Sequence, residues 1–124
     1  MKCQFTALSL AVLTSTSWAA ANIVDIAWTA DGHFNHVATV APKQLLEVCG
    51  KLALGQVVTW SFESSSALPF NIHVHQGKSV VYPARLERVD RAQGRQTFEA
   101  EAAHCWMWTN TSALPVRVQV DLQR

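Results

Sequence analysis

The sequence predicts an all-β protein, a single antiparallel β-sandwich of about seven short strands preceded by a cleaved signal peptide. Three observations support this prediction. The 124 residues suit one domain rather than two. Hydrophobic residues make up 49% of the chain and charged residues 15%, a balance that excludes a disordered tail. Several segments alternate apolar with polar residues, which is the period of strands with one buried face.

The N-terminal segment has the three-part layout of a secretory signal peptide. After a positive start, residues 7–13 are almost continuously apolar and residues 14–21 are mostly small. The apolar core is about seven residues long, far below the ~20 residues that a membrane-spanning helix needs. We therefore expect a signal peptide at residues 1–21, cleaved after Ala21 with Ala19 as the alternative. The remaining domain, residues 22–124, is expected in the periplasm or outside the cell.

The first half of this domain offers three strand predictions and one helical segment. Residues 23–28 and 36–40 are predicted as N-terminal strands, whereas residues 42–48 have a short helical pattern. Residues 56–63 are predicted as a strand, because Val58, Trp60 and Phe62 would share one side. The serines at positions 64–66 are expected in a loop.

A hairpin and three further strands are predicted in the second half. Residues 70–75 place Phe70, Ile72 and Val74 on one face, and a turn at residues 76–78 returns the chain along residues 79–82. Residues 97–102 and 104–109 are aromatic-rich strand candidates. The clearest strand covers residues 114–122, where four aliphatic residues alternate with polar ones.

Side-chain parity predicts which residues share the outer face of the sandwich. Trp106 and Trp108 lie on the same side of their strand, and their large apolar surface favours the core. Alternation then turns Cys105 and Met107 outward, and it likewise turns the histidines of the 70–75 strand outward. If the two strands are neighbours, one outer face carries four candidate metal ligands: His73, His75, Cys105 and Met107.

This combination of two imidazoles, a thiol and a thioether is a ligand set that suits copper. Cys105 has a competing role, however, because the domain keeps two cysteines and an exported chain with an even count favours a disulfide. A bond between Cys49 and Cys105 would close a loop of about 55 residues. It would leave His73 and His75, with Met107 as an optional ligand.

The other histidines are weaker candidates. His104 has the parity of the tryptophans, so we expect it to lie inward and to be hydrogen-bonded. His33 and His36 lie beside an Asp-Gly turn, which argues against the helix that would align them as a pair.

Residues 45–122 resemble the GOLD-type β-sandwich of secretory-pathway cargo receptors. The resemblance rests on Cys49, the segment 55–58, the hairpin at 70–82 and the run Cys105 to Asn110, with His104 where that family has a tyrosine. It implies a secreted interaction domain. The chain also resembles cupredoxins in size and in an early histidine at position 73 or 75. It departs from their blue-copper pattern because no histidine follows Cys105.

The leading functional hypothesis is a small exported copper-binding protein for storage, delivery or sensing. The alternative is a metal-free protein-interaction module. No carboxylate pair or nucleophile–base constellation is visible, so we expect no enzyme. The net charge of +1 gives no reason to expect nucleic acid, and no segment of the domain approaches membrane-spanning length. The sequence leaves the partner and the oligomeric state open.

Overall fold

The computed structural model describes residues 22–124, and the predicted signal peptide lies outside the described residues. The described part is all β, and none of it forms a helix that is long and apolar enough to cross a membrane. The predicted fold class is therefore confirmed. The seven strands are β1 (Asn22–Asp25), β2 (His33–Val40), β3 (Leu45–Leu52), β4 (Val57–Gln76), β5 (Ser79–Thr97), β6 (Ala102–Thr109) and β7 (Val116–Gln123).

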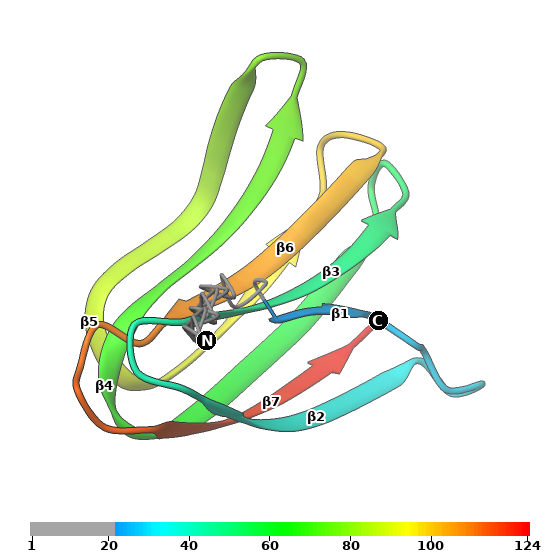
Figure 1. Ribbon diagram of the computed structural model, residues 1–124. Helices are drawn as coiled ribbons and strands as arrows, with labels where there is room; N and C mark the ends of the chain where they lie inside the picture. The colour runs from blue at the N-terminus through cyan, green and yellow to red at the C-terminus, as the bar shows by residue number, and fades with distance from the viewer. Residues whose placement is uncertain (1–21) are drawn as a thin grey trace, which may run out of the picture.

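All seven strands belong to one curled sheet in the order β1-β3-β6-β4-β7-β2, with β5 alongside β4 (Figure 1). The long strand β4 connects the two layers. It pairs with β7 along residues 59–64 and with β6 along residues 70–74. Register shifts in the β4–β5 pairing, the first between Glu63 and Leu68, mark where both strands bend from one layer into the other.

The bend corrects the prediction of a loop at residues 64–66, because these serines lie within β4. The hydroxyl groups of Ser64 and Ser65 form hydrogen bonds with the backbone where the regular ladder is interrupted. Ser64 Oγ donates to the carbonyls of Ser66 and Asp90, at 2.8 and 3.2 Å, and Ser65 Oγ accepts from the Arg117 N–H at 2.9 Å. As a result β4 and β5 extend over 20 and 19 residues instead of forming short strands.

Two other element predictions were wrong. Residues 42–48 are not helical, because a turn leads into β3, where Leu46, Val48 and Leu52 are fully buried against the core. Residues 97–102 form the end of β5 and its connection to β6. Phe98 in this connection is buried and exchanges two backbone hydrogen bonds with Gly55 and Gln56. The sheet also contains a parallel pair, β1 with β3, and is therefore mixed.

The core lies between the inner faces of the two layers. Trp106 and Trp108 are both fully buried, as side-chain parity predicts. The ring of Trp108 packs with those of Phe62 and Phe70 at a centroid distance of 5.4 Å from each, and the two phenylalanine rings lie 4.7 Å apart. Burial of these aromatic rings fixes which side of β4 and β6 faces outward.

Candidate functional site

The outer face of β3, β6 and β4 brings the predicted residues into two neighbouring rows. In one row His73 lies opposite Cys105, which lies opposite Cys49. In the next row Met107 lies between Glu47 on β3 and Asn71 on β4. The thioether therefore lies one row away from His73.

Cys105 is bonded to Cys49, 56 positions earlier in the sequence. Of its two predicted roles, the structure therefore shows the disulfide. Since the sulfur carries no free thiol, Cys105 is not available as a thiolate ligand. Within residues 22–124 no group of three or more His, Cys, Asp or Glu side chains could hold a metal ion.

His73 is enclosed by polar neighbours. Its Nδ1 lies 2.8 Å from Asn71 Oδ1 and its Nε2 lies 3.5 Å from Glu47 Oε1, and its side chain is only 7% exposed. Burial lowers the pKa of His73, and nearby His75 lowers it further, although the Glu47 carboxylate opposes both effects. Only a doubly protonated ring satisfies both oxygen partners at once, and burial disfavours that form.

His75 and Tyr82 extend this polar cluster to the hairpin surface. The rings of His73 and His75 meet edge to face with centroids 5.3 Å apart, and the Tyr82 ring lies 6.1 Å from His73. The guanidinium of Arg85 lies 5.1 Å from the Tyr82 ring centroid. Tyr82 is 45% exposed, so the cluster ends in an aromatic side chain that a partner can reach.

The first part of β5 is the feature that the sequence analysis missed. Val80, Val81, Tyr82 and Leu86 are exposed, and they make up four of the eight exposed large hydrophobic residues of the described part. Among the described strands β5 pairs only with β4, so its other edge is free. The available signal was the uninterrupted apolar run at positions 80–82, which does not fit the alternation of a strand with one buried face.

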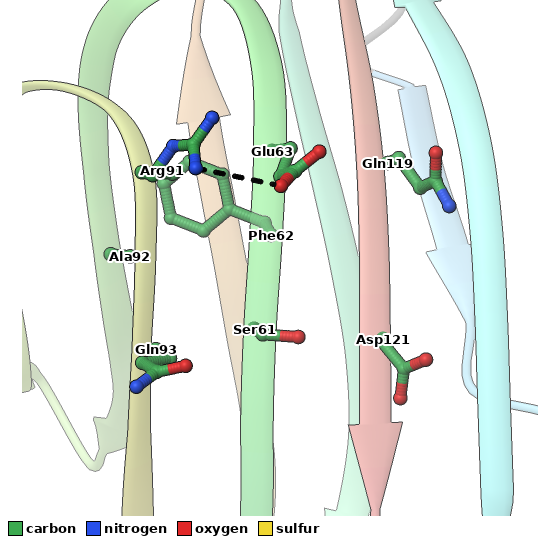
Figure 2. A pocket seen from close by; sticks show the side chains of 8 residues that line it. All are labelled: Ser61, Phe62, Glu63, Arg91, Ala92, Gln93, Gln119 and Asp121. Atoms are coloured by element: carbon green, nitrogen blue, oxygen red, sulfur yellow. Dashed lines mark ion pairs between the residues drawn. The ribbon is translucent and has the colours of Figure 1, made fainter.

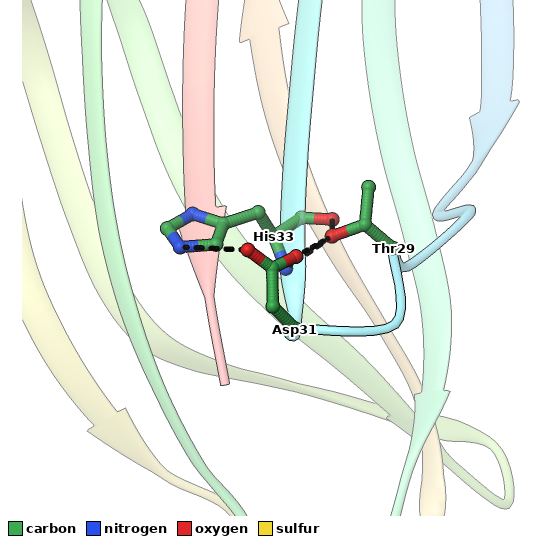
Figure 3. Close-up of polar contacts among 3 residues, drawn as sticks. All are labelled: Thr29, Asp31 and His33. Atoms are coloured by element: carbon green, nitrogen blue, oxygen red, sulfur yellow. Dashed lines mark hydrogen bonds and ion pairs between the residues drawn. The ribbon is translucent and has the colours of Figure 1, made fainter.

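The remaining histidines do not form a pair. His33 is the first residue of β2, and its Nε2 is 4.0 Å from Asp31 Oδ2, while the Thr29 hydroxyl donates to the other carboxylate oxygen, Oδ1 (Figure 3). The hydrogen bond from Thr29 lowers the pKa of Asp31. His36 is three positions away on a strand and therefore faces the opposite side of β2.

A polar hollow of about 700 Å³ lies on the outer face of β4, β5 and β7 (Figure 2). Ser61, Gln93 and Asp121 line it together with Glu63 and Arg91, whose charged groups lie 3.9 Å apart. Both charged side chains are more than 70% exposed, so solvent screens the pair. We interpret this hollow as a solvated polar face.

No family model and no curated protein matches the chain. The chain is, however, similar to several solved structures. PliG from Salmonella Typhimurium, a periplasmic inhibitor of g-type lysozyme, is 10% identical over 83% of this chain and 97% of its own, with a TM-score of 0.58. PliG from Aeromonas hydrophila is 15% identical over 83% and 97% of the two chains, with a TM-score of 0.54.

The mitogen of Yersinia pseudotuberculosis is also similar, with 11% identity over 75% of this chain and 86% of its own and a TM-score of 0.58. At these identities the similarity shows the fold alone. The comparisons do not confirm a GOLD-like or cupredoxin-like family. They support a small β-sandwich-like fold.

Proposed function

We propose that this chain is a small, exported, non-catalytic module that binds a protein partner along the free edge of β5. The observation that carries the proposal is the cluster of Val80, Val81 and Tyr82 on that edge, each more than 40% exposed. Burying an apolar side chain stabilises a complex by up to about 1.5–3 kcal/mol. Alternation along β5 turns Val80 and Tyr82 to the outer face and Val81 to the opposite face, so a partner on this edge meets apolar side chains on both faces of the sheet.

The edge also offers main-chain hydrogen-bonding groups. An unpaired edge strand can accept an extended segment of another protein, which adds one strand to the sheet. Pro83 has no N–H and interrupts this ladder, so the partner segment is expected to pair on either side of that residue.

Charge favours an acidic partner over a second copy of the chain. Residues 78–95 carry five basic side chains and two acidic ones, whereas the rest of the described chain carries four basic and seven acidic ones. Two copies of such an edge repel each other, which opposes self-association. An acidic segment meets Arg85 and Arg88, neither of which has an ion-pair partner in the described part.

The comparisons support the class of partner. The two PliG proteins are described as periplasmic lysozyme inhibitors, so this fold serves protein binding in an exported setting elsewhere. Identities of 10–15% transfer neither the target nor the binding residues of those proteins to this chain.

Site-specific photocrosslinking tests the proposal. A photoreactive phenylalanine replaces Val81 on β5 or, as the matched control, Val37, an exposed valine on another edge strand, β2. We expect a discrete adduct with an exported protein from position 81 only, formed in the presence of a chelator and reduced by Arg85→Glu/Arg88→Glu. Equal adducts from both positions, or none from position 81, would reject binding at the β5 edge.

Copper binding is a second candidate, favoured by the 5.3 Å separation of the His73 and His75 rings. The two imidazoles would be the nitrogen ligands, with Met107 as an optional soft ligand. Copper would have to draw His73 away from Glu47 and Asn71, so we expect weak binding. Isothermal titration of the wild type and of His73→Ala/His75→Ala measures it, and equal affinities of the two proteins would exclude these ligands.

A further inference from the structure

A small pocket lies between the β4–β5 hairpin and the β5–β6 connection. Its volume is about 210 Å³, which is below the ~300 Å³ typical of the smallest drug-sized sites. The pocket therefore suits one side chain or a small molecule. Its apolar wall includes Val74, Val81 and Phe98, and its polar lining includes Glu99 and His104.

His104 is the buried polar group in this lining, with 2% of its surface exposed. Its Nδ1 lies 2.8 Å from the Ala102 carbonyl, so Nδ1 carries a proton and donates. The Phe98 ring packs edge to face against the imidazole at a centroid distance of 4.0 Å. The atom that His104 can offer to the pocket is therefore Nε2, which has no hydrogen-bond partner within residues 22–124.

Burial lowers the pKa of His104, outweighing the opposing effect of the hydrogen bond to Ala102. The ring is accordingly neutral at pH 7, and a neutral ring with a proton on Nδ1 has an acceptor lone pair on Nε2. Glu99 provides the second acceptor of the lining, with a negative charge. The two acceptors, Glu99 and His104, favour a positively charged hydrogen-bond donor, and the apolar wall of the pocket favours an aliphatic stem.

We propose that this pocket binds a primary alkylammonium group. The stem lies against Val74, Val81 and Phe98, while the ammonium donates to His104 Nε2 and to the Glu99 carboxylate. The group can come from a free small amine or from a lysine side chain of a protein. The proposal does not depend on strand addition at β5.

Titration of the 22–124 domain with n-pentylammonium, followed by NMR of the His104 ring and the Val81 methyl groups, tests the proposal. We expect saturable shifts, with n-pentanol and pentanoate binding at least about tenfold more weakly because they lack the charged donor. The peptide acetyl-Gly-Lys-Gly-amide is the second arm. Shifts by both amines support either source, whereas shifts by the free amine alone assign the site to a small molecule.

Matched variants separate the pocket from the fold. Glu99→Gln should weaken n-pentylammonium binding about tenfold, whereas Glu101→Gln, whose side chain faces Lys51 instead, should leave it unchanged. His104→Phe should abolish binding. Glu99→Gln keeps the test valid if that variant fails to fold. Binding of pentanol as tight as that of the ammonium, or equal affinities of the two glutamate variants, would overturn the proposal.

Discussion

Asn110 shows how one buried side chain connects three strands. It is 1% exposed and lies just after β6. Its Nδ2 donates to the carbonyls of Val40 and Leu114 at 3.0 and 2.7 Å, and its Oδ1 accepts from the backbone and the hydroxyl of Ser112. The amide thus fixes the connection from β6 to β7 against the end of β2. In the folded state it is not available for glycosylation at Asn110-Thr111-Ser112.

We expect Asn110→Ala to lower the free energy of unfolding by about 2–4 kcal/mol, because it leaves buried carbonyl and N–H groups without partners. Urea unfolding followed by tryptophan fluorescence measures the change. Thr111→Ala is the control, since that side chain is exposed and should change stability by less than about 0.5 kcal/mol. Similar unfolding midpoints of the two variants would contradict the role of the amide.

Strands β3 and β6 are held together by the Cys49–Cys105 disulfide, which joins residues directly opposite each other in the ladder. In the chain-entropy model, a bond that closes a loop of this length stabilises the folded state by about 4 kcal/mol. Cys49→Ser/Cys105→Ser should therefore unfold at a lower guanidinium concentration while keeping the strand pairing. The reduced wild type should match the double variant, and an unchanged midpoint would contradict this contribution.

The sequence predicts best those strands in which one face is buried and the other is exposed to solvent. Val116, Val118 and Val120 alternate with polar residues on β7, and this pattern gave the correct strand. The helical prediction at residues 42–48 failed because tertiary packing outweighed the local pattern. As part of a strand, Leu46 and Val48 are buried in the core, and this burial outweighed a weak helical period. The prediction of a loop at the serines of β4 failed for another reason. Hydrogen bonds formed by hydroxyl groups hold the strand at this bend, and they leave no hydrophobic pattern in the sequence.

The candidate site was only partly predictable for a related reason. Parity placed His73 on the outer face, because parity depends on local alternation alone. The enclosure of that ring by Glu47 depends on the neighbouring strands, and the sequence does not specify them. The free edge of β5 likewise follows from the order of strands in the complete sheet.

At the scale of the whole molecule, residues 22–124 contain two buried histidines, His73 and His104, whose pKa values lie below the usual 6.5 chiefly because of burial. The folded state then binds fewer protons than the unfolded chain once the pH falls below about 6.5. The contribution of the two neutral histidines to the free energy of unfolding is fully present above that pH. It is lost as the pH falls toward the pKa values that the histidines have in the folded state.

We therefore expect the free energy of unfolding to decrease from pH 7 to pH 5, with a slope of at most about 1.4 kcal/mol per pH unit for each histidine. Urea unfolding at a series of pH values measures this slope. His73→Gln should flatten it, whereas His75→Gln, which removes only a minor cause of the low pKa of His73, should flatten it much less. A wild-type stability that is constant over this pH range would contradict the assignment.

The passage of β4 and β5 through both layers means that the molecule has no seam between its halves. Cleavage of the backbone near residue 65 would not release an independent sheet. The inner apolar face of each layer would be exposed to water unless the other layer covered it. Force or heat should therefore unfold both layers of the sandwich in a single cooperative step.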